Sequence, residues 1–241
     1  MSIFVLVHGS WHDGSAWKAV IQHLEAKGHQ AFAPTIAGHG KGANKNVNHA
    51  QCTQSIVDYI VSNNLTDIVL LGHSFGGTVI AKVAEAIGDR IRRLIFFNAF
   101  VLNDGESLRD NIPHESQALF DSLARESDDN TMMMPFEIWR EAFLNDADLE
   151  LARSSYTQLS SEPYQPWIDK LDMKQFYSLP IPKSYLYCSE DIALPQGEWG
   201  WHPKMSSRLG LFRFAQMPGS HEVMFSNPSG LAEKIIVAGR D

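Results

Sequence analysis

The sequence is poor in cysteine and in basic residues, and it has no hydrophobic run long enough to cross a bilayer. Its two cysteines, Cys52 and Cys188, form neither a metal-ligand spacing nor a CxxC redox motif. We therefore expect two reduced, buried thiols and no bound metal or cofactor. Lys and Arg number 20 against 28 Asp and Glu, which argues against a nucleic-acid-binding surface. The longest apolar runs have the length of strands, well below the roughly 20 residues of a membrane helix.

The first residues also lack the pattern of a secretory leader. The stretch MSIFVLVHG leads directly into a strand, without basic residues, a longer apolar core and a cleavage site. We expect a cytoplasmic protein, monomeric or homodimeric, that acts on a small molecule and has neither nucleic acid nor membrane as a partner. Apolar residues make up 44 % of the 241 residues, which is enough for a packed core.

Strand-like apolar runs alternate with amphipathic helical patterns over most of the chain. The expected strands are residues 3–7, 30–34, 67–71, 92–97, 184–188 and 211–215. This alternation predicts an α/β fold with a mostly parallel six-stranded sheet and helices on both faces. It stops between about residues 105 and 180, where we expect a mainly helical cap inserted into a core formed by residues 1–104 and 181–241.

A Gly-x-Ser-x-Gly pattern, Gly72-His73-Ser74-Phe75-Gly76, follows the third expected strand. Chance alone can produce this pattern, but a strand before it and a helix after it are typical of a nucleophile elbow. In that turn the serine hydroxyl is exposed near a helix N-terminus, which favours negative charge. Ser74 is therefore predicted to be a nucleophile.

A serine nucleophile needs a general base, and ten histidines are available. His221 follows the last expected strand in QMPGSHE, at the edge of the sheet where Ser74 is also expected. We interpret His8, at a strand end, and His73, within the elbow, as structural. His8 and His12 are four residues apart, but no helix and no intervening Glu support a zinc site there. His221 is the predicted base.

The base in turn needs a carboxylate that fixes its tautomer. Asp191 follows the fifth expected strand, in Ser189-Glu190-Asp191, and the order Ser74, Asp191, His221 is the one associated with this type of elbow. Glu190 and Asp104, which lies just past the fourth expected strand, stay open as alternatives. Asp191 is the predicted acid.

Acyl transfer also requires hydrogen-bond donors for the oxyanion, each contributing roughly 3–4 kcal/mol in the transition state. One is expected from the backbone amide of Phe75, the residue after the nucleophile. The other is expected from the amide of Ser10, in the HGSWH segment after the first strand, and the Ser10 hydroxyl could add a third hydrogen bond. The same segment is also a tight turn, and the two interpretations are compatible.

Four motifs together carry a resemblance to a known family. VLVHGSWHDGSAW, LLGHSFGG, CSEDIALP and MPGSHEVMF resemble the α/β-hydrolase superfamily, and most of all the branch that holds plant methyl esterases, hydroxynitrile lyases and their bacterial relatives. This resemblance implies a serine hydrolase that needs no cofactor. The cyanogenic lyases of the branch carry a Thr where this chain has Gly9, and a Lys where it has Glu222. Both differences favour hydrolysis.

Residues 194–222 are similar to carbendazim-hydrolysing esterases, which act on a methyl benzimidazolyl carbamate. This resemblance implies an ester or carbamate substrate with a flat aromatic group. Aromatic residues of the cap either stack on such a group or pack the core. The residues expected to line the pocket are Trp11, His12, Trp139, Phe143 and Trp167. A hydroxynitrile lyase, a cofactor-free oxygenase and a non-enzymatic ligand receptor on the same scaffold are the alternatives.

Overall fold

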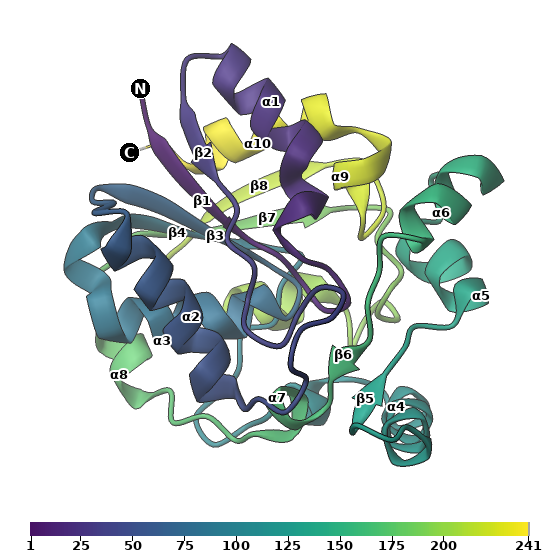
Figure 1. Ribbon diagram of the computed structural model, residues 1–241. Helices are drawn as coiled ribbons and strands as arrows, with labels where there is room; N and C mark the ends of the chain where they lie inside the picture. Colours follow the sequence, from purple (N-terminus) through teal and green to yellow (C-terminus); the bar gives the residue numbers. More distant parts are fainter. Residues whose placement is uncertain (241) are drawn as a thin grey trace.

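The computed structural model describes residues 1–240, and its centre is a six-stranded sheet (Figure 1). From edge to edge the strands are β2 (Gln30–Phe32), β1 (Ile3–Val7), β3 (Ile68–His73), β4 (Ile91–Phe97), β7 (Lys183–Cys188) and β8 (Arg213–Met217). Every pair of neighbours is parallel. The predicted α/β fold is confirmed, with a sheet that is parallel throughout.

The central strands are apolar without alternation because helices cover both faces of the sheet. Leu70 and Leu71 of β3 point to opposite faces, yet neither has exposed surface. The edge strand β8 alternates between buried and exposed positions instead. The apolar pattern placed the start of this strand at Leu211, but β8 begins at Arg213. Leu211 lies before the strand and is 97 % exposed.

Helices form a layer on each face of the sheet (Figure 1). On one face α1 (Lys18–Ala26) packs against α10 (Pro228–Ala238), and on the other α2 (His49–Ser62) packs against α3 (Gly76–Ile87). A 3-10 turn, Gly14–Trp17, precedes α1, and another, Gly88–Arg90, follows α3. These helices are the amphipathic segments that alternate with the strands in the sequence.

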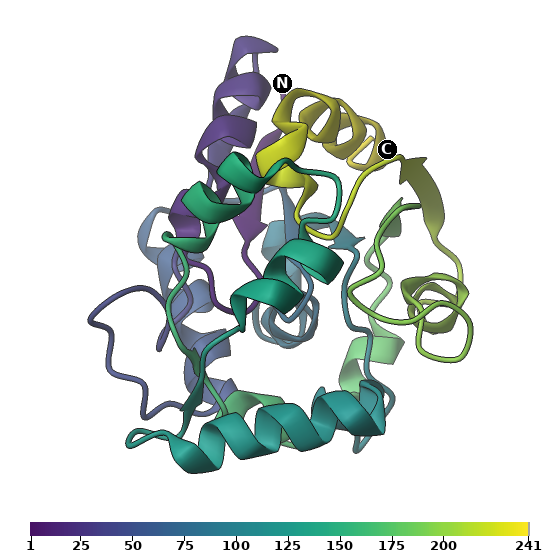
Figure 2. The same ribbon diagram turned by 90° about the vertical axis from the view of Figure 1, so that its right-hand side faces the viewer.

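The segment between β4 and β7 is mainly helical, as predicted. Its helices are α4 (His114–Glu126), α5 (Phe136–Ile138), α6 (Leu149–Tyr156), α7 (Gln165–Ile168) and α8 (Lys174–Ser178), with a 3-10 turn at Arg109–Asn111 and a π-helical turn at Trp139–Phe143. Two short strands that the sequence did not predict, β5 (Thr131–Met132) and β6 (Glu162–Pro163), pair in antiparallel fashion. Figure 2 shows α4, α5 and α6 framing the face that lies beyond the strand ends. By contrast, α8 packs on α3.

The parallel arrangement brings the loops after β1, β3, β7 and β8 to the same edge of the sheet, which is where ligands bind in such folds. The loop after β7 contains a π-helical turn at Trp201–Met205, and α9 (Val223–Ser226) follows β8. None of the helices in residues 1–240 combines the length and the apolar character that crossing a bilayer requires.

Candidate active site

Ser74 occupies the sharp turn between β3 and α3. Its φ of 51° lies in the left-handed region, which costs a non-glycine residue on the order of 1–3 kcal/mol. A Cβ atom on Gly72 would lie 2.4 Å from the carbonyl oxygen of Gly76, and one on Gly76 would lie 2.6 Å from the carbonyl oxygen of His8. Only glycine fits at these two positions, so the sequence pattern is a requirement of the turn that presents the Ser74 hydroxyl.

His221 and Asp191 form a buried pair at the same edge of the sheet. The Nδ1 atom of His221 lies 2.7 Å from Oδ2 of Asp191, whose other oxygen accepts a hydrogen bond from the Ala193 amide at 2.9 Å. Asp191 has no exposed surface and His221 is 1 % exposed. Because Nδ1 faces a carboxylate, it carries the proton, which leaves the Nε2 lone pair free to accept one.

The environment of His221 makes its imidazole a stronger base than a free histidine. Burial lowers its pKa, but the negative charge of Asp191, the hydrogen bond to Asp191 and the charge of Glu222 raise it by more, so that the pKa lies above its ordinary value of 6.5. The ring is also fixed by packing. It stacks on Trp201 with ring centroids 5.0 Å apart and meets the edge of Phe143 at 5.2 Å.

The two alternative acids lie elsewhere. Asp104 is exposed, and its Oδ1 atom accepts a hydrogen bond from the Met173 amide at 3.0 Å. Glu190 is also exposed, although it is adjacent in sequence to Asp191. The geometry therefore brings Asp191, and neither alternative, to His221.

The amides of Ser10 and Phe75 were predicted to be the oxyanion donors. In the described part of the chain neither amide donates to another protein group. The loop that contains Ser10 passes directly over the elbow, because a Cβ atom on Gly9 would lie 2.9 Å from Cβ of Ser74. The Ser10 hydroxyl accepts a hydrogen bond from Nε1 of Trp167 at 3.0 Å. Because the hydroxyl is the acceptor in this bond, its own proton can still be donated, and the two amides are available as well.

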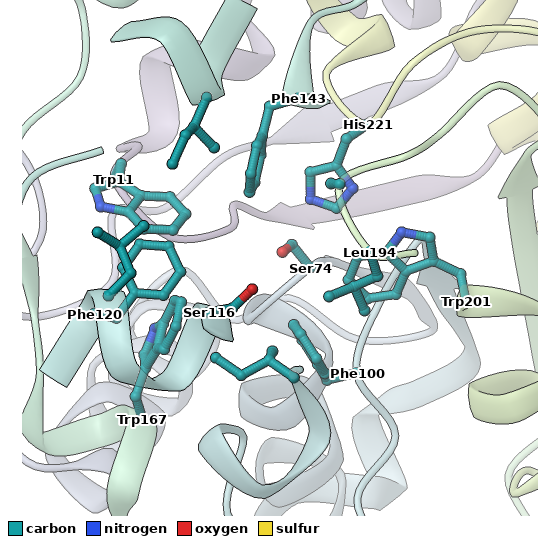
Figure 3. A pocket seen from close by; sticks show the side chains of 14 residues that line it. Trp11, Ser74, Phe100, Ser116, Phe120, Phe143, Trp167, Leu194, Trp201 and His221 are labelled. Carbon is teal, nitrogen blue, oxygen red and sulfur yellow. The ribbon is translucent and has the colours of Figure 1, made fainter. Parts of the chain in front are cut away.

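Ser74 and His221 line the same cavity, and Figure 3 shows the imidazole pointing toward the serine side chain. The wall is otherwise almost wholly apolar and contains no Lys, Arg, Asp or Glu. Its members are Trp11, Phe100, Ile112, Ser116, Leu119, Phe120, Ile138, Phe143, Trp167, Ala193, Leu194 and Trp201. Trp11, Phe120 and Trp167 meet in edge-to-face or tilted contacts, with centroids 5.1–5.6 Å apart.

Three of the five predicted pocket residues, Trp11, Phe143 and Trp167, are in this wall. The prediction for His12 and Trp139 is wrong, because both lie behind it. His12 is bonded to Glu222 at 3.0 Å, and the indole of Trp139 is fully buried against α6, donating to the Ala152 carbonyl at 3.2 Å. Sequence reasoning missed Phe120, Leu194 and Trp201. Leu194 could have been found, because it follows Asp191 by only three residues.

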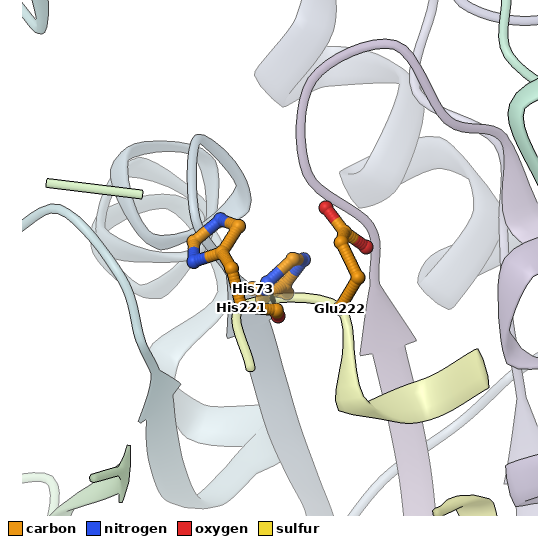
Figure 4. Close-up of side chains that lie close together, drawn as sticks. All are labelled: His73, His221 and Glu222. Atoms are coloured by element: carbon orange, nitrogen blue, oxygen red, sulfur yellow. Dashed lines mark hydrogen bonds between the residues drawn. The ribbon is translucent and has the colours of Figure 1, made fainter. Parts of the chain in front are cut away.

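A cluster of His73, His221 and Glu222 brings possible metal-ligand atoms within 4.8 Å of one another (Figure 4). Each residue already has a protein partner. His73 Nε2 donates to the His221 carbonyl at 3.0 Å, Glu222 contacts His12, and His221 contacts Asp191. These contacts hold all three side chains in place, so we interpret the cluster as support for the His221 backbone and ring.

A model of the family described as "Alpha/beta hydrolase family" matches residues 4–234. The chain belongs to the alpha/beta hydrolase family. Membership confirms the resemblance that the four sequence motifs carry, and it agrees with the all-parallel sheet and the elbow at Ser74.

Several relatives are esterases. An extracellular alpha/beta-hydrolase from a Paenibacillus species, described as sharing structural and functional homology with tobacco salicylic acid binding protein 2, is 47 % identical with a TM-score of 0.98, and each chain is covered fully. Carbendazim hydrolyzing esterase of Nocardioides sp. is 38 % identical over 116 residues, which span 47 % of this chain and only 48 % of that relative. Methylesterase 1 of Arabidopsis thaliana is 27 % identical over 95 % of this chain and 93 % of its own.

These likenesses confirm the methyl esterase branch and support ester hydrolysis as the general activity of this alpha/beta hydrolase. They leave the substrate open, since the relatives differ in theirs. The cytoplasmic location expected from the sequence stays a prediction.

Proposed function

We propose that this chain is a serine esterase that hydrolyses small, neutral esters or carbamates carrying a flat aromatic group. The observation that carries the proposal is the buried Asp191–His221 pair, which opens onto the same aromatic-walled cavity as Ser74. Ser74 is the proposed nucleophile, His221 the general base and Asp191 the residue that orients the base. The amides of Ser10 and Phe75 are the proposed oxyanion donors.

The geometry supports a two-step acyl transfer. The neutral Nε2 atom of His221 takes the proton of the Ser74 hydroxyl while the serine oxygen attacks the carbonyl carbon. The carbonyl oxygen becomes an oxyanion that the two amides stabilise. As the bond to the leaving alcohol or amine breaks, His221 returns the proton to it. A water molecule, deprotonated by His221, then releases the acyl or carbamoyl group and restores the Ser74 hydroxyl.

The character of the cavity supports an uncharged aromatic substrate. Transferring an ion into a wall with no charged side chain is costly, whereas a flat ring can pack on Trp11, Phe120 and Trp167. Figure 3 shows the hydroxyl of Ser116 pointing into the cavity, where it can bond a polar atom of the substrate. A carbamate is included because a relative is a carbendazim hydrolyzing esterase.

Two structural features argue against the hydroxynitrile lyase. A side chain at position 9 would collide with Ser74, since even a Cβ atom there would lie 2.9 Å from Cβ of Ser74. The carboxylate of Glu222 faces His12 where a lyase would carry a cation for the departing cyanide. The oxygenase and the ligand receptor remain alternatives of other classes, and experiment separates them from the esterase.

Replacing the nucleophile tests the proposal directly. We expect Ser74→Ala to lower kcat for a chromogenic aryl ester by roughly 10⁴- to 10⁶-fold, because only the oxyanion donors and binding remain. Circular dichroism and the unfolding midpoint should match those of the unmodified protein. A serine-directed phosphonate should block turnover with one equivalent bound per chain, and it should not label the variant.

Near-normal turnover by Ser74→Ala would refute the serine mechanism. Oxygen consumption in proportion to turnover would favour the oxygenase. Release of cyanide from mandelonitrile at a rate comparable with ester hydrolysis would favour the lyase. Tight binding of aromatic esters without any turnover or phosphonate labelling would favour the receptor.

A further inference from the structure

Glu162 is a carboxylate with no exposed surface, placed by the unpredicted strand β6 beneath the loop that carries Ser10. A carboxylate taken out of water is stable only where donors or opposite charge surround it. Its Oε2 atom accepts a hydrogen bond from the Trp11 amide at 2.9 Å, and its Oε1 atom accepts one from Nε1 of Trp167 at 3.2 Å. Oε2 also lies 2.9 Å from Nε2 of His39. Trp11 and His39 are distant from Glu162 in sequence, whereas Trp167 follows it by five residues.

The first of these contacts holds an unfavourable backbone conformation. Trp11, the residue after Ser10, has a φ of 65°, which a bulky side chain avoids. Besides the amide bond to Glu162, its carbonyl accepts from the Ser160 amide at 2.9 Å and its indole donates to the Met132 carbonyl at 3.0 Å. All of these partners lie on or beside β5 and β6. Contacts with the cap therefore hold the residue that directly follows Ser10.

The second contact reaches the side chain of Ser10. Nε1 of Trp167, which donates to Glu162, also lies 3.0 Å from the Ser10 hydroxyl. The carboxylate thus orients the indole that binds Ser10. Trp167 and Trp11 connect Glu162 to this donor residue from two directions.

The third contact reaches the other donor. The ring of His39 is stacked on the ring of Phe75, with centroids 5.7 Å apart and an interplanar angle of 18°. Its Nδ1 atom lies 3.1 Å from the Ala37 carbonyl and its Nε2 atom lies against Glu162, so both nitrogens face oxygen acceptors. The contact with Glu162 is close, but it is not a well-aligned hydrogen bond.

We propose that Glu162 is a positioning residue for catalysis, which fixes both proposed oxyanion donors, Ser10 through Trp11 and Trp167, and Phe75 through His39. The inference rests on the proposed function, because it assigns a role in that reaction. Glu162 does not touch the reacting atoms. It acts by holding two amides at the distance and angle that a developing oxyanion needs.

The variant Glu162→Gln tests the positioning role. It keeps the size and shape of the side chain but removes the negative charge. It also replaces one accepting oxygen by an NH₂ group, which would face N–H donors. We expect kcat per active site, titrated with a phosphonate, to fall about 10- to 100-fold, because loss of one whole oxyanion donor costs about 10²–10³-fold. KM should change less than about threefold. Affinity for an aryl trifluoromethyl ketone, which becomes a hemiketal oxyanion on Ser74, should fall by the same factor as kcat. Affinity for the matching uncharged amide should not.

A merely structural role gives a different pattern. The variant would then melt at a lower temperature and yield fewer titratable sites, but kcat per site would stay within about twofold of the unmodified protein. The ratio of ketone to amide affinity would also be preserved, and this result would overturn the proposal. Glu106→Gln is a matched control. This half-buried carboxylate accepts hydrogen bonds from Asn103, Asn111 and Arg208, and it has no hydrogen bond to Ser10, Trp11 or Phe75 in the described part of the chain. It should keep both kcat and the affinity ratio.

If Glu162→Gln does not fold, His39→Gln tests the half of the proposal that concerns Phe75, and it should show the same selective loss for the ketone. A normal ketone-to-amide ratio in this variant would refute that half. Failure of the proposed function would look different, because the unmodified protein would then show no ester turnover that a phosphonate blocks.

Discussion

Two residues of the site, Ser74 and Trp11, adopt left-handed backbone conformations without being glycine. The first belongs to the elbow and could be predicted, since the pattern of flanking glycines implies a strained turn. The second could not, because nothing local in the sequence indicates it. Its conformation depends on bonds to Glu162 and Met132, which lie 151 and 121 residues further along the chain. Strain of the first kind can be predicted from sequence, whereas strain of the second kind requires the folded chain.

At the same scale, the raised pKa of His221 predicts the acid side of the pH profile. The base acts when neutral, so kcat/KM should fall as pH drops through a pKa above 6.5. Asp191→Asn removes the charge that raises this pKa and leaves the burial that lowers it. The acid limb should therefore move to lower pH, while kcat drops by roughly 10⁴-fold through the wrong tautomer. Initial rates across the pH range measure both effects.

Asp104→Asn is the control for this experiment. Its carboxylate is exposed and bonds to the Met173 amide, so neither the rate nor the acid limb should change. A larger loss of rate in this variant than in Asp191→Asn would mean that the acid has been assigned to the wrong residue.

Among the elements, those of the sheet and its two helix layers could be predicted because each follows from a local pattern. Continuous apolar runs gave the buried strands, and their ends located Ser74, Asp191 and His221. The cap is different. Its short helices and the pair β5–β6 have few residues each, and their positions depend on contacts with the rest of the fold. The pocket prediction was accordingly wrong for His12 and Trp139, whose burial depends on long-range packing.

The contact between α3 and the sheet predicts a stability difference between two glycines of the same region. A Cβ atom on Gly76 would lie 2.6 Å from a backbone oxygen that cannot move aside, so Gly76→Ala should destabilise the fold by about 1–3 kcal/mol or more. Gly88, just past the other end of α3, would meet only the tip of the Ile181 side chain, at 3.2 Å. Gly88→Ala should therefore cost little. Urea unfolding of both variants gives the comparison, and equal stabilities would contradict the predicted collision.

For the whole molecule, buried histidines make stability depend on pH. Burial lowers the pKa of His8 and His73 well below 6.5, and it lowers that of His49 to about 4. Below pH 6.5 these histidines are protonated in the unfolded chain but stay neutral in the folded protein. The free energy of unfolding therefore falls as the solution becomes more acidic. His221 acts in the opposite direction, because its pKa is raised and its contribution is lost as pH increases. Because three buried histidines have a lowered pKa and one has a raised pKa, we expect acid to destabilise the protein.

His49 offers a quantitative test. Burial dominates its shift, Asp169 opposes it and Lys82 adds to it. On this basis His49 alone should make the protein about 2 kcal/mol less stable at pH ~5 than at pH ~7.5. In His49→Gln the difference between the two urea-unfolding free energies should shrink by about this amount, whatever the variant costs at either pH. An unaltered difference would show that His49 titrates normally in the folded state.

The uncharged wall around Ser74 also determines how the reaction ends. Hydrolysis of an ester converts a neutral substrate into a carboxylate anion. The residues that line the cavity include no Lys or Arg that could form an ion pair with this anion. The anion loses most of its hydration there and gains no Lys or Arg partner, so the cavity should bind it more weakly than a neutral molecule of the same shape. We expect the acid to inhibit at least about tenfold more weakly than its isosteric primary amide, measured as competitive inhibition constants above the pKa of the acid. Such an enzyme would keep turning over while its own product accumulates.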